Sequence, residues 1–168
     1  MKKKIFFLYL QAGGGHISTA RAIAKYMEQH HESIEPVLID GFTEAPSWLK
    51  KIVIDGYKTS QTKGQRVYEL LYRIHKRWLA AKISQVGISW LLQKYIKKAL
   101  LQYDPSHVVV LHFFLVRPVV HAIKARAKPI PVTTIITDPF TLHPLRSLDK
   151  YMEYVVFSER AKNIVLKR

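Results

Sequence analysis

The sequence predicts an α/β fold, with a parallel sheet of about five strands and helices on both faces of the sheet. Two observations support this prediction. Short, continuously apolar segments, typical of strands buried on both faces, alternate with longer segments whose apolar residues recur at helical spacing. The chain also has 168 residues, of which 48% are hydrophobic and 23% charged, so it is long enough for one domain with its own core.

The N-terminal part predicts a strand, a helix and a second strand. Residues 5–10 are continuously apolar and form the first expected strand, which the three glycines at 13–15 end. An apolar stripe at helical spacing over residues 20–27 predicts the helix. Residues 37–40 predict the second strand, and a right-handed crossover makes the two strands parallel.

The middle of the chain predicts further helices. Residues 49–57 predict a short helix, and residues 67–78 and 79–101 follow helical spacing, with a break expected near Gly87. We therefore expect residues 43–101 to form a basic amphipathic helical insertion within the domain.

Strands and helices alternate again in the last part of the chain. Pro118 is compatible with the first turn of a helix, where a missing N–H costs nothing. The elements expected here are strands at 108–111, 132–136 and 154–157 and helices at 117–127 and 159–167.

In parallel sheets of this kind, binding sites lie beyond the carboxyl ends of the strands. Those ends carry the Gly13-Gly14-Gly15-His16 turn, Gly41, His112 and Thr137-Asp138. The glycines let a ligand approach the backbone closely, and the following helix N-terminus offers N–H groups to an anion. A histidine at this position can accept a proton, and the positive end of the helix favours its neutral form. The alternative is a tight turn with an incidental histidine, since the dinucleotide fingerprint and the Walker motif are both missing.

A second candidate site combines Thr137-Asp138-Pro139 with His143-Pro144. Asp138 could orient His143 or bind a hydroxyl group. The alternative is an aspartate that only caps a turn, as Asp-Pro often does.

The composition excludes some classes of site and favours one class of partner. The chain has no cysteine, which excludes disulfides and thiolate metal sites, and its histidines show no metal-ligand spacing. The formal net charge of +15 favours an anionic partner. The apolar run at 5–10 is too short for a signal peptide, and polar residues interrupt the strongest apolar stretch, 108–123, before it reaches membrane-spanning length.

Most of the net positive charge lies between residues 50 and 98, which carry 12 Lys or Arg against two acidic residues. Basic residues beside tryptophan and tyrosine are typical of a segment that lies on a membrane surface and binds anionic lipids. A soluble helical subdomain would explain the apolar spacing equally well, but not the scarcity of acidic residues. Nucleic-acid binding lacks a recognisable motif. The expected membrane-surface residues are Arg66, Arg73, Lys76, Arg77, Trp78 and Trp90.

Three stretches together resemble one family. Residues 7–16 with 20–23 resemble the opening of the diacylglycerol glycosyltransferases, which include plant monogalactosyldiacylglycerol synthases and are related to MurG-like GT-B glycosyltransferases. The second signature of that family resembles Thr137-Asp138 with His143-Pro144. Residues 149–162 resemble the stretch that closes its N-terminal domain. The order of these three stretches and the distances between them along the chain match the family pattern across essentially the whole sequence.

The resemblance implies the N-terminal half of a GT-B fold, in which two Rossmann-like domains face each other across a cleft. Residues 1–168 would form a single acceptor-binding domain that holds diacylglycerol and lies peripherally on the cytoplasmic face of the cell membrane. The resemblance implies that His16 deprotonates the acceptor hydroxyl and that Gly14 and Gly15 lie near the donor phosphates. Asp138 and His143 would border the acceptor cleft. No metal or cofactor is expected beyond the UDP-sugar, which is a substrate.

Two departures from the family pattern affect the expected function. The sequence has no second glycine-rich nucleotide site, and Arg146 stands where relatives often carry an aromatic residue. We therefore expect an acceptor-binding domain of a glycolipid glycosyltransferase that is inactive without a donor-binding domain, which a separate chain could supply. The alternative is a non-enzymatic peripheral membrane-binding domain.

Overall fold

The structure is a computed structural model that describes residues 2–11, 14–51, 78–137 and 152–166. Its strands form one sheet in the order β2-β1-β3-β4-β5, and every neighbouring pair is parallel. The strands are β1 (Lys3–Tyr9), β2 (Ile34–Asp40), β3 (His107–Val110), β4 (Val132–Ile136) and β5 (Glu153–Val156).

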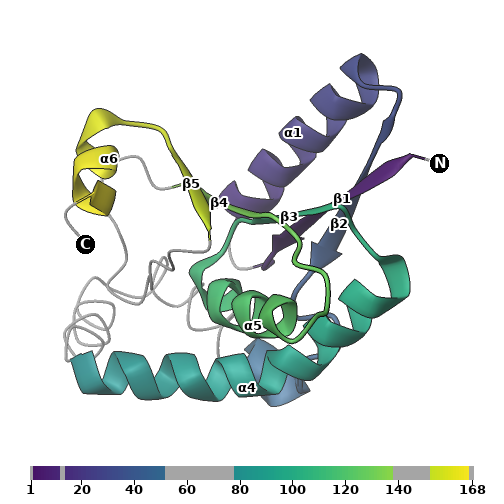
Figure 1. The fold of residues 1–168 in the computed structure, drawn as a ribbon. Coiled ribbons are helices and arrows are strands. Elements are labelled where there is room, and N and C mark those ends of the chain that lie inside the picture. Colours follow the sequence, from purple (N-terminus) through teal and green to yellow (C-terminus); the bar gives the residue numbers. More distant parts are fainter. Residues whose placement is uncertain (1, 12–13, 52–77, 138–151, 167–168) are drawn as a thin grey trace.

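Helices cover both faces of this sheet, which confirms the predicted fold class (Figure 1). Helix α1 packs on one face, and α4 and α5 pack together on the other. The helices are α1 (Gly15–His30), α4 (Trp78–Tyr103), α5 (Phe113–Lys124) and α6 (Glu159–Leu166), and residues 47–51 are also helical.

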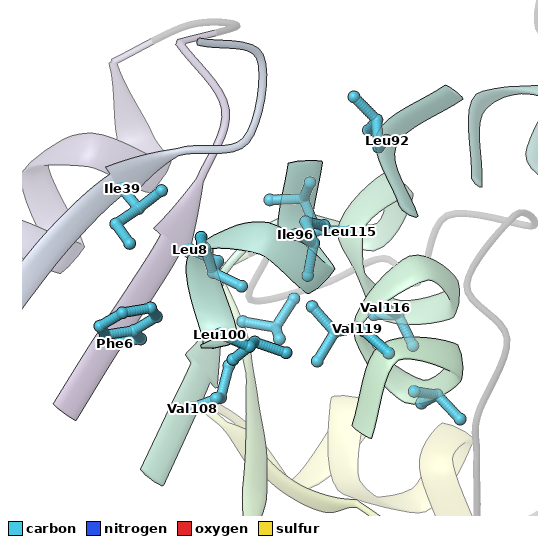
Figure 2. Packing of buried hydrophobic residues seen from close by; sticks show 14 of the residues in the cluster. Phe6, Leu8, Ile39, Leu92, Ile96, Leu100, Val108, Leu115, Val116 and Val119 are labelled. Carbon is cyan, nitrogen blue, oxygen red and sulfur yellow. The ribbon is translucent and has the colours of Figure 1, made fainter. Parts of the chain in front are cut away.

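The apolar strands are buried because successive side chains point to opposite faces of the sheet. Phe6 and Leu8 face α4 and α5, while Phe7 between them faces α1, and all three are at most 1% exposed. Figure 2 shows Phe6 and Leu8 beside Leu100 of α4. Each fully buried side chain of this size stabilises the fold by about 1.5–3 kcal/mol, so β1 anchors both layers.

Gly41, directly after β2, lets α5 approach the sheet. A Cβ at this position would lie 2.4 Å from Cδ2 of Leu115, which is fully buried. The backbone N–H of Gly41 still donates to the carbonyl of Tyr9 at 2.8 Å and so continues the pairing of β1 with β2. The glycine is therefore needed for space.

Helix α5 begins earlier than the sequence predicts, at Phe113 instead of residue 117, so Pro118 lies inside the helix. The early start follows from His112, whose side chain caps the helix by accepting from the backbone N–H of Phe114 at 3.2 Å. Histidine is not among the residues usually preferred at this position, which explains why the sequence did not reveal the cap.

Two further boundaries differ from expectation. Strand β2 starts at Ile34 and includes Pro36, which is tolerated because β2 is an edge strand with one neighbour. Helix α4 continues through Gly87, where a break was expected, so that prediction was wrong. One glycine costs a helix only about 1 kcal/mol, and burial of Leu92 and Ile96 against α5 and the sheet offsets that cost.

Candidate functional site

The candidate site lies where the chain connections diverge from the centre of the sheet. From β1 the chain passes through α1 to β2 on one side, and from β3 it passes through α5 to β4 on the other. Strands β1 and β3 are neighbours, with Leu8 opposite Val110, so α1 and α5 start next to each other on opposite faces. Such a divergence at the carboxyl ends of parallel strands is where α/β folds commonly bind ligands.

The N-terminus of α1 is open to an anion. Gly14 is the N-cap and provides no side chain to bond the first N–H groups, and the first turn contains no acidic residue. The side chains of Ser18 and Thr19 instead donate to the carbonyl of Gly15, at 3.0 and 2.9 Å. The positive end of the helix dipole, with no side-chain cap at Gly14 and no acidic residue in the first turn, favours a bound phosphate or carboxylate.

Gly14 and Gly15, which precede His16, are not required by the described part of the fold. A Cβ built on either residue meets no atom of the described residues within 4 Å. The backbone at Gly14, with φ −85° and ψ −24°, suits any residue. Glycine here therefore keeps space open beside the helix N-terminus, in contrast to Gly41, which is tightly packed.

His16, in the first turn of α1, is half-buried and is contacted from two other strands of the sheet. Its Nδ1 lies 3.1 Å from the hydroxyl oxygen of Thr137, the residue that follows β4. Its ring also meets the ring of His112, which follows β3, with centroids 4.8 Å apart and planes at 70°. Three strand ends therefore converge on one imidazole.

His112 was noted in the sequence only as a residue at a strand end, and Thr137 only as part of the Thr137-Asp138-Pro139 motif, so neither was predicted to contact His16. Their contacts with His16 span 121 and 96 positions of the chain. Their position relative to the strands could have identified them. Thr137 directly follows β4, and His112 is separated from β3 by one residue. Only the strand order brings them to the same imidazole.

A phenol lies at the same edge of the sheet. Tyr9 ends β1 and is paired in register with Asp40 at the end of β2. Burial raises the pKa of Tyr9, the charge of Asp40 raises it further, and Arg21 partly opposes both. The hydroxyl of Tyr9 is therefore a proton-bearing donor at neutral pH.

Several predicted site residues lie outside the described residues. These include Asp138 and His143 of the second candidate site. Among the predicted membrane-surface residues they include Arg66, Arg73, Lys76 and Arg77, while Trp78 is the residue at which α4 begins.

Trp90, by contrast, lies on a well-defined surface of α4. One side of the helix is buried through Leu92 and Ile96, whereas Trp90 is 75% exposed. Trp90 belongs to a set of exposed residues at helical spacing, here called the α4 outer stripe: Val86, Trp90, Lys94, Lys97 and Leu101. An exposed tryptophan beside lysines is the pattern expected of a membrane-surface segment. Among the described residues, no helix is long and apolar enough to cross a membrane.

Comparison with known proteins identifies the family. The family model for monogalactosyldiacylglycerol (MGDG) synthase matches residues 16–168, a span that begins at His16 and covers most of the chain. The chain belongs to the MGDG synthase family. The family expected from the sequence is thereby confirmed, and it is a family of glycolipid glycosyltransferases.

Two curated relatives from plants agree with this assignment. A probable chloroplastic monogalactosyldiacylglycerol synthase of Nicotiana tabacum is 24% identical over 145 residues. Chloroplastic monogalactosyldiacylglycerol synthase 1 of Arabidopsis thaliana is 23% identical over 145 residues. Each match covers 84% of this chain but 27% of the relative. This chain therefore spans about a quarter of the length of these MGDG synthases.

Proposed function

We propose that this chain is the acceptor-binding domain of a nucleotide-sugar-dependent glycolipid glycosyltransferase, with His16 as its general base. The observation that supports the proposal most strongly is the position of His16, at the divergence of the sheet and beside an open helix N-terminus. An imidazole there can remove a proton from a hydroxyl while an anionic group binds next to it.

The proposed reaction uses one nitrogen of His16 for the proton and the other for orientation. When Nδ1–H donates to the hydroxyl oxygen of Thr137, Nε2 carries the lone pair that accepts the proton of the diacylglycerol hydroxyl. The hydroxyl oxygen then forms a bond to the anomeric carbon of the sugar. The bond from that carbon to the phosphate oxygen breaks, and the nucleoside diphosphate leaves with the electron pair. A positioned base of this kind contributes about 10²–10⁴-fold to such a step.

We propose that Gly14 and Gly15 lie beside the phosphates of the donor. The space above both residues and the uncapped start of α1 would admit a diphosphate and stabilise the charge that develops as the nucleotide leaves. Asp138 and His143 are proposed to border the acceptor cleft, and UDP-sugar is the proposed donor. No metal or cofactor takes part in the proposed reaction.

The nucleotide-sugar itself is proposed to be gripped by residues outside these 168, on a further GT-B domain or on a separate donor-binding chain. The chain spans 27% of the length of its curated relatives, which leaves room in those proteins for such a domain. A donor-binding domain would complete the other wall of the cleft.

We further propose that the α4 outer stripe contacts anionic lipids on the inner face of the cell membrane, where diacylglycerol is presented. Trp90 would insert at the level of the headgroups while Lys94 and Lys97 pair with lipid phosphates. The same stripe supports the second candidate, a peripheral membrane-binding domain without catalytic activity.

The two candidates differ in a complementation assay. The purified 168-residue chain is incubated with labelled UDP-sugar and diacylglycerol vesicles, alone and together with the donor-binding domain of a relative. We expect no transfer by the chain alone and restored transfer with the added domain. Vesicle binding without any restored transfer would favour the non-enzymatic candidate instead.

A further inference from the structure

His112 is one of the few polar side chains in the described core. It is 6% exposed and lies between β3 and α5, next to Leu111, whose N–H donates to the carbonyl of Leu8 at 2.9 Å. The hydrogen bond ties this corner to β1, the strand that precedes His16. His112 is therefore fixed relative to the start of α1.

The contacts of His112 define which nitrogen carries its hydrogen. Nδ1 accepts from the backbone N–H of Phe114 at 3.2 Å. A backbone N–H can only donate, so Nδ1 has no hydrogen and the neutral ring carries it on Nε2. Adding a proton to Nδ1 would remove the cap of α5 and place a cation at the positive end of that helix. The fold thus favours one neutral tautomer.

The plane of this ring is fixed as well. The ring of Phe113 stacks on His112 with centroids 4.4 Å apart and planes at 25°. The ring of Phe114 lies 5.3 Å away. With its Nδ1 held by the cap and its ring held by two aromatic neighbours, the imidazole of His112 is a rigid surface.

His16 rests against this surface. The two imidazoles meet edge to face, at 4.8 Å and 70°, while Thr137 holds Nδ1 of His16 from the side of β4. A neutral His112 adds no positive charge that would oppose protonation of its neighbour. A ring held from two directions keeps one rotamer, which is the requirement for a base that must reach a hydroxyl group.

We propose that His112 is a positioning residue for His16: a rigid, neutral imidazole that fixes the ring plane and rotamer of the base without touching the reacting atoms. Its catalytic consequence rests on the proposed function. The positioning itself depends only on the geometry of the chain. The two can therefore be tested separately.

The direct test is the imidazole signal of His16 in long-range ¹H–¹⁵N spectra of the labelled chain at pH 8, above the ordinary histidine pKa of about 6.5. The variant His112→Asn keeps a side-chain acceptor for the cap of α5 but removes the ring. We expect the ¹⁵N shifts of His16 to move by several ppm and its lines to broaden as the ring samples more than one rotamer. The control His121→Asn, on the exposed side of α5, should leave the His16 signal unchanged.

Unchanged His16 shifts and line widths in folded His112→Asn would overturn the proposal. If that variant does not fold, His112→Gln supplies a longer acceptor and the same comparison is made. When the chain is combined with a donor-binding domain, we expect the kcat of His112→Asn to be about tenfold below that of the wild type. Its KM for UDP-sugar should be unchanged. A response of His16 in the spectra, combined with no transferase activity in the wild type, would support the positioning and contradict the proposed function.

Discussion

A single imidazole at the site depends on residues that are distant in the sequence. His16 is positioned by the turn after β1. Its hydrogen-bond partner, Thr137, follows β4, and its ring neighbour, His112, follows β3. Each contact alone is ordinary, since a hydroxyl or an aromatic neighbour is common around buried histidines. The role of His16 as a base is supported because these contacts meet where the chain connections from β1 and β3 leave the sheet in opposite directions.

A different histidine, His107, makes stability depend on pH. Its Nε2 lies 2.9 Å from the hydroxyl oxygen of Thr133, and burial lowers its pKa below 6.5, with the charge of Glu153 opposing that change. The folded chain therefore binds fewer protons here than the unfolded chain. The stabilising contribution is complete above about pH 6.5 and is lost as the pH falls through the lowered pKa.

The variant His107→Gln tests this linkage, because glutamine can still bond to Thr133 but does not titrate. We expect the fall in melting temperature between pH 7 and pH 5 to be smaller in the variant than in the wild type. His121→Gln, at an exposed position, serves as the control and should show the same fall in melting temperature as the wild type. If His107→Gln also shows that same fall, His107 does not contribute to the pH dependence of stability.

At the scale of the elements, close packing between β2 and α5 requires Gly41. Gly41→Ala places a methyl group 2.4 Å from a side-chain carbon of buried Leu115. We expect a loss of about 1–3 kcal/mol in the free energy of unfolding, measured by urea denaturation. Gly15→Ala is the matched control, since its new methyl group meets no atom of the described residues within 4 Å. Equal stabilities of the two variants would contradict the packing described here.

The α4 outer stripe carries the prediction about membranes. Lys94→Gln with Lys97→Gln should weaken binding to anionic vesicles by about 2 kcal/mol, or roughly 30-fold, since each lysine near an anionic surface contributes about 1 kcal/mol. The control pair is Arg21→Gln with Lys25→Gln on α1, which removes the same charge from the opposite face of the sheet. Co-sedimentation measures both. If the two pairs weaken binding equally, only the net charge matters and the stripe is not a specific surface.

The elements were predicted well from sequence where hydrophobic burial decides the structure. The apolar runs within β1 and β3 are continuous because both faces of these strands are covered. The failures occurred where tertiary contacts override local signals. Helix α4 continues through Gly87 because Leu92 and Ile96, which follow the glycine, are buried in the core, and α5 starts early because His112 caps it. Neither effect can be derived from spacing alone.

At the scale of the whole molecule, the sequence predicted the sheet, its two helical layers and the family, but only part of the site. It located His16 and the glycines because a short turn between a buried strand and a helix is a local feature. It could not bring Thr137 and His112 to His16, because that contact depends on the strand order β2-β1-β3-β4-β5. The order places the ends of β1, β3 and β4 side by side.

His16 is proposed as the base of a sugar transfer to a lipid hydroxyl. The decisive measurement is the rate of hexose transfer from UDP-sugar to diacylglycerol by the chain combined with a donor-binding domain, compared between the wild type and His16→Gln. We expect kcat to fall about 10²–10⁴-fold, while His30→Gln, at the far end of α1, leaves the rate unchanged. A folded His16→Gln variant that transfers sugar at the wild-type rate would contradict the claim.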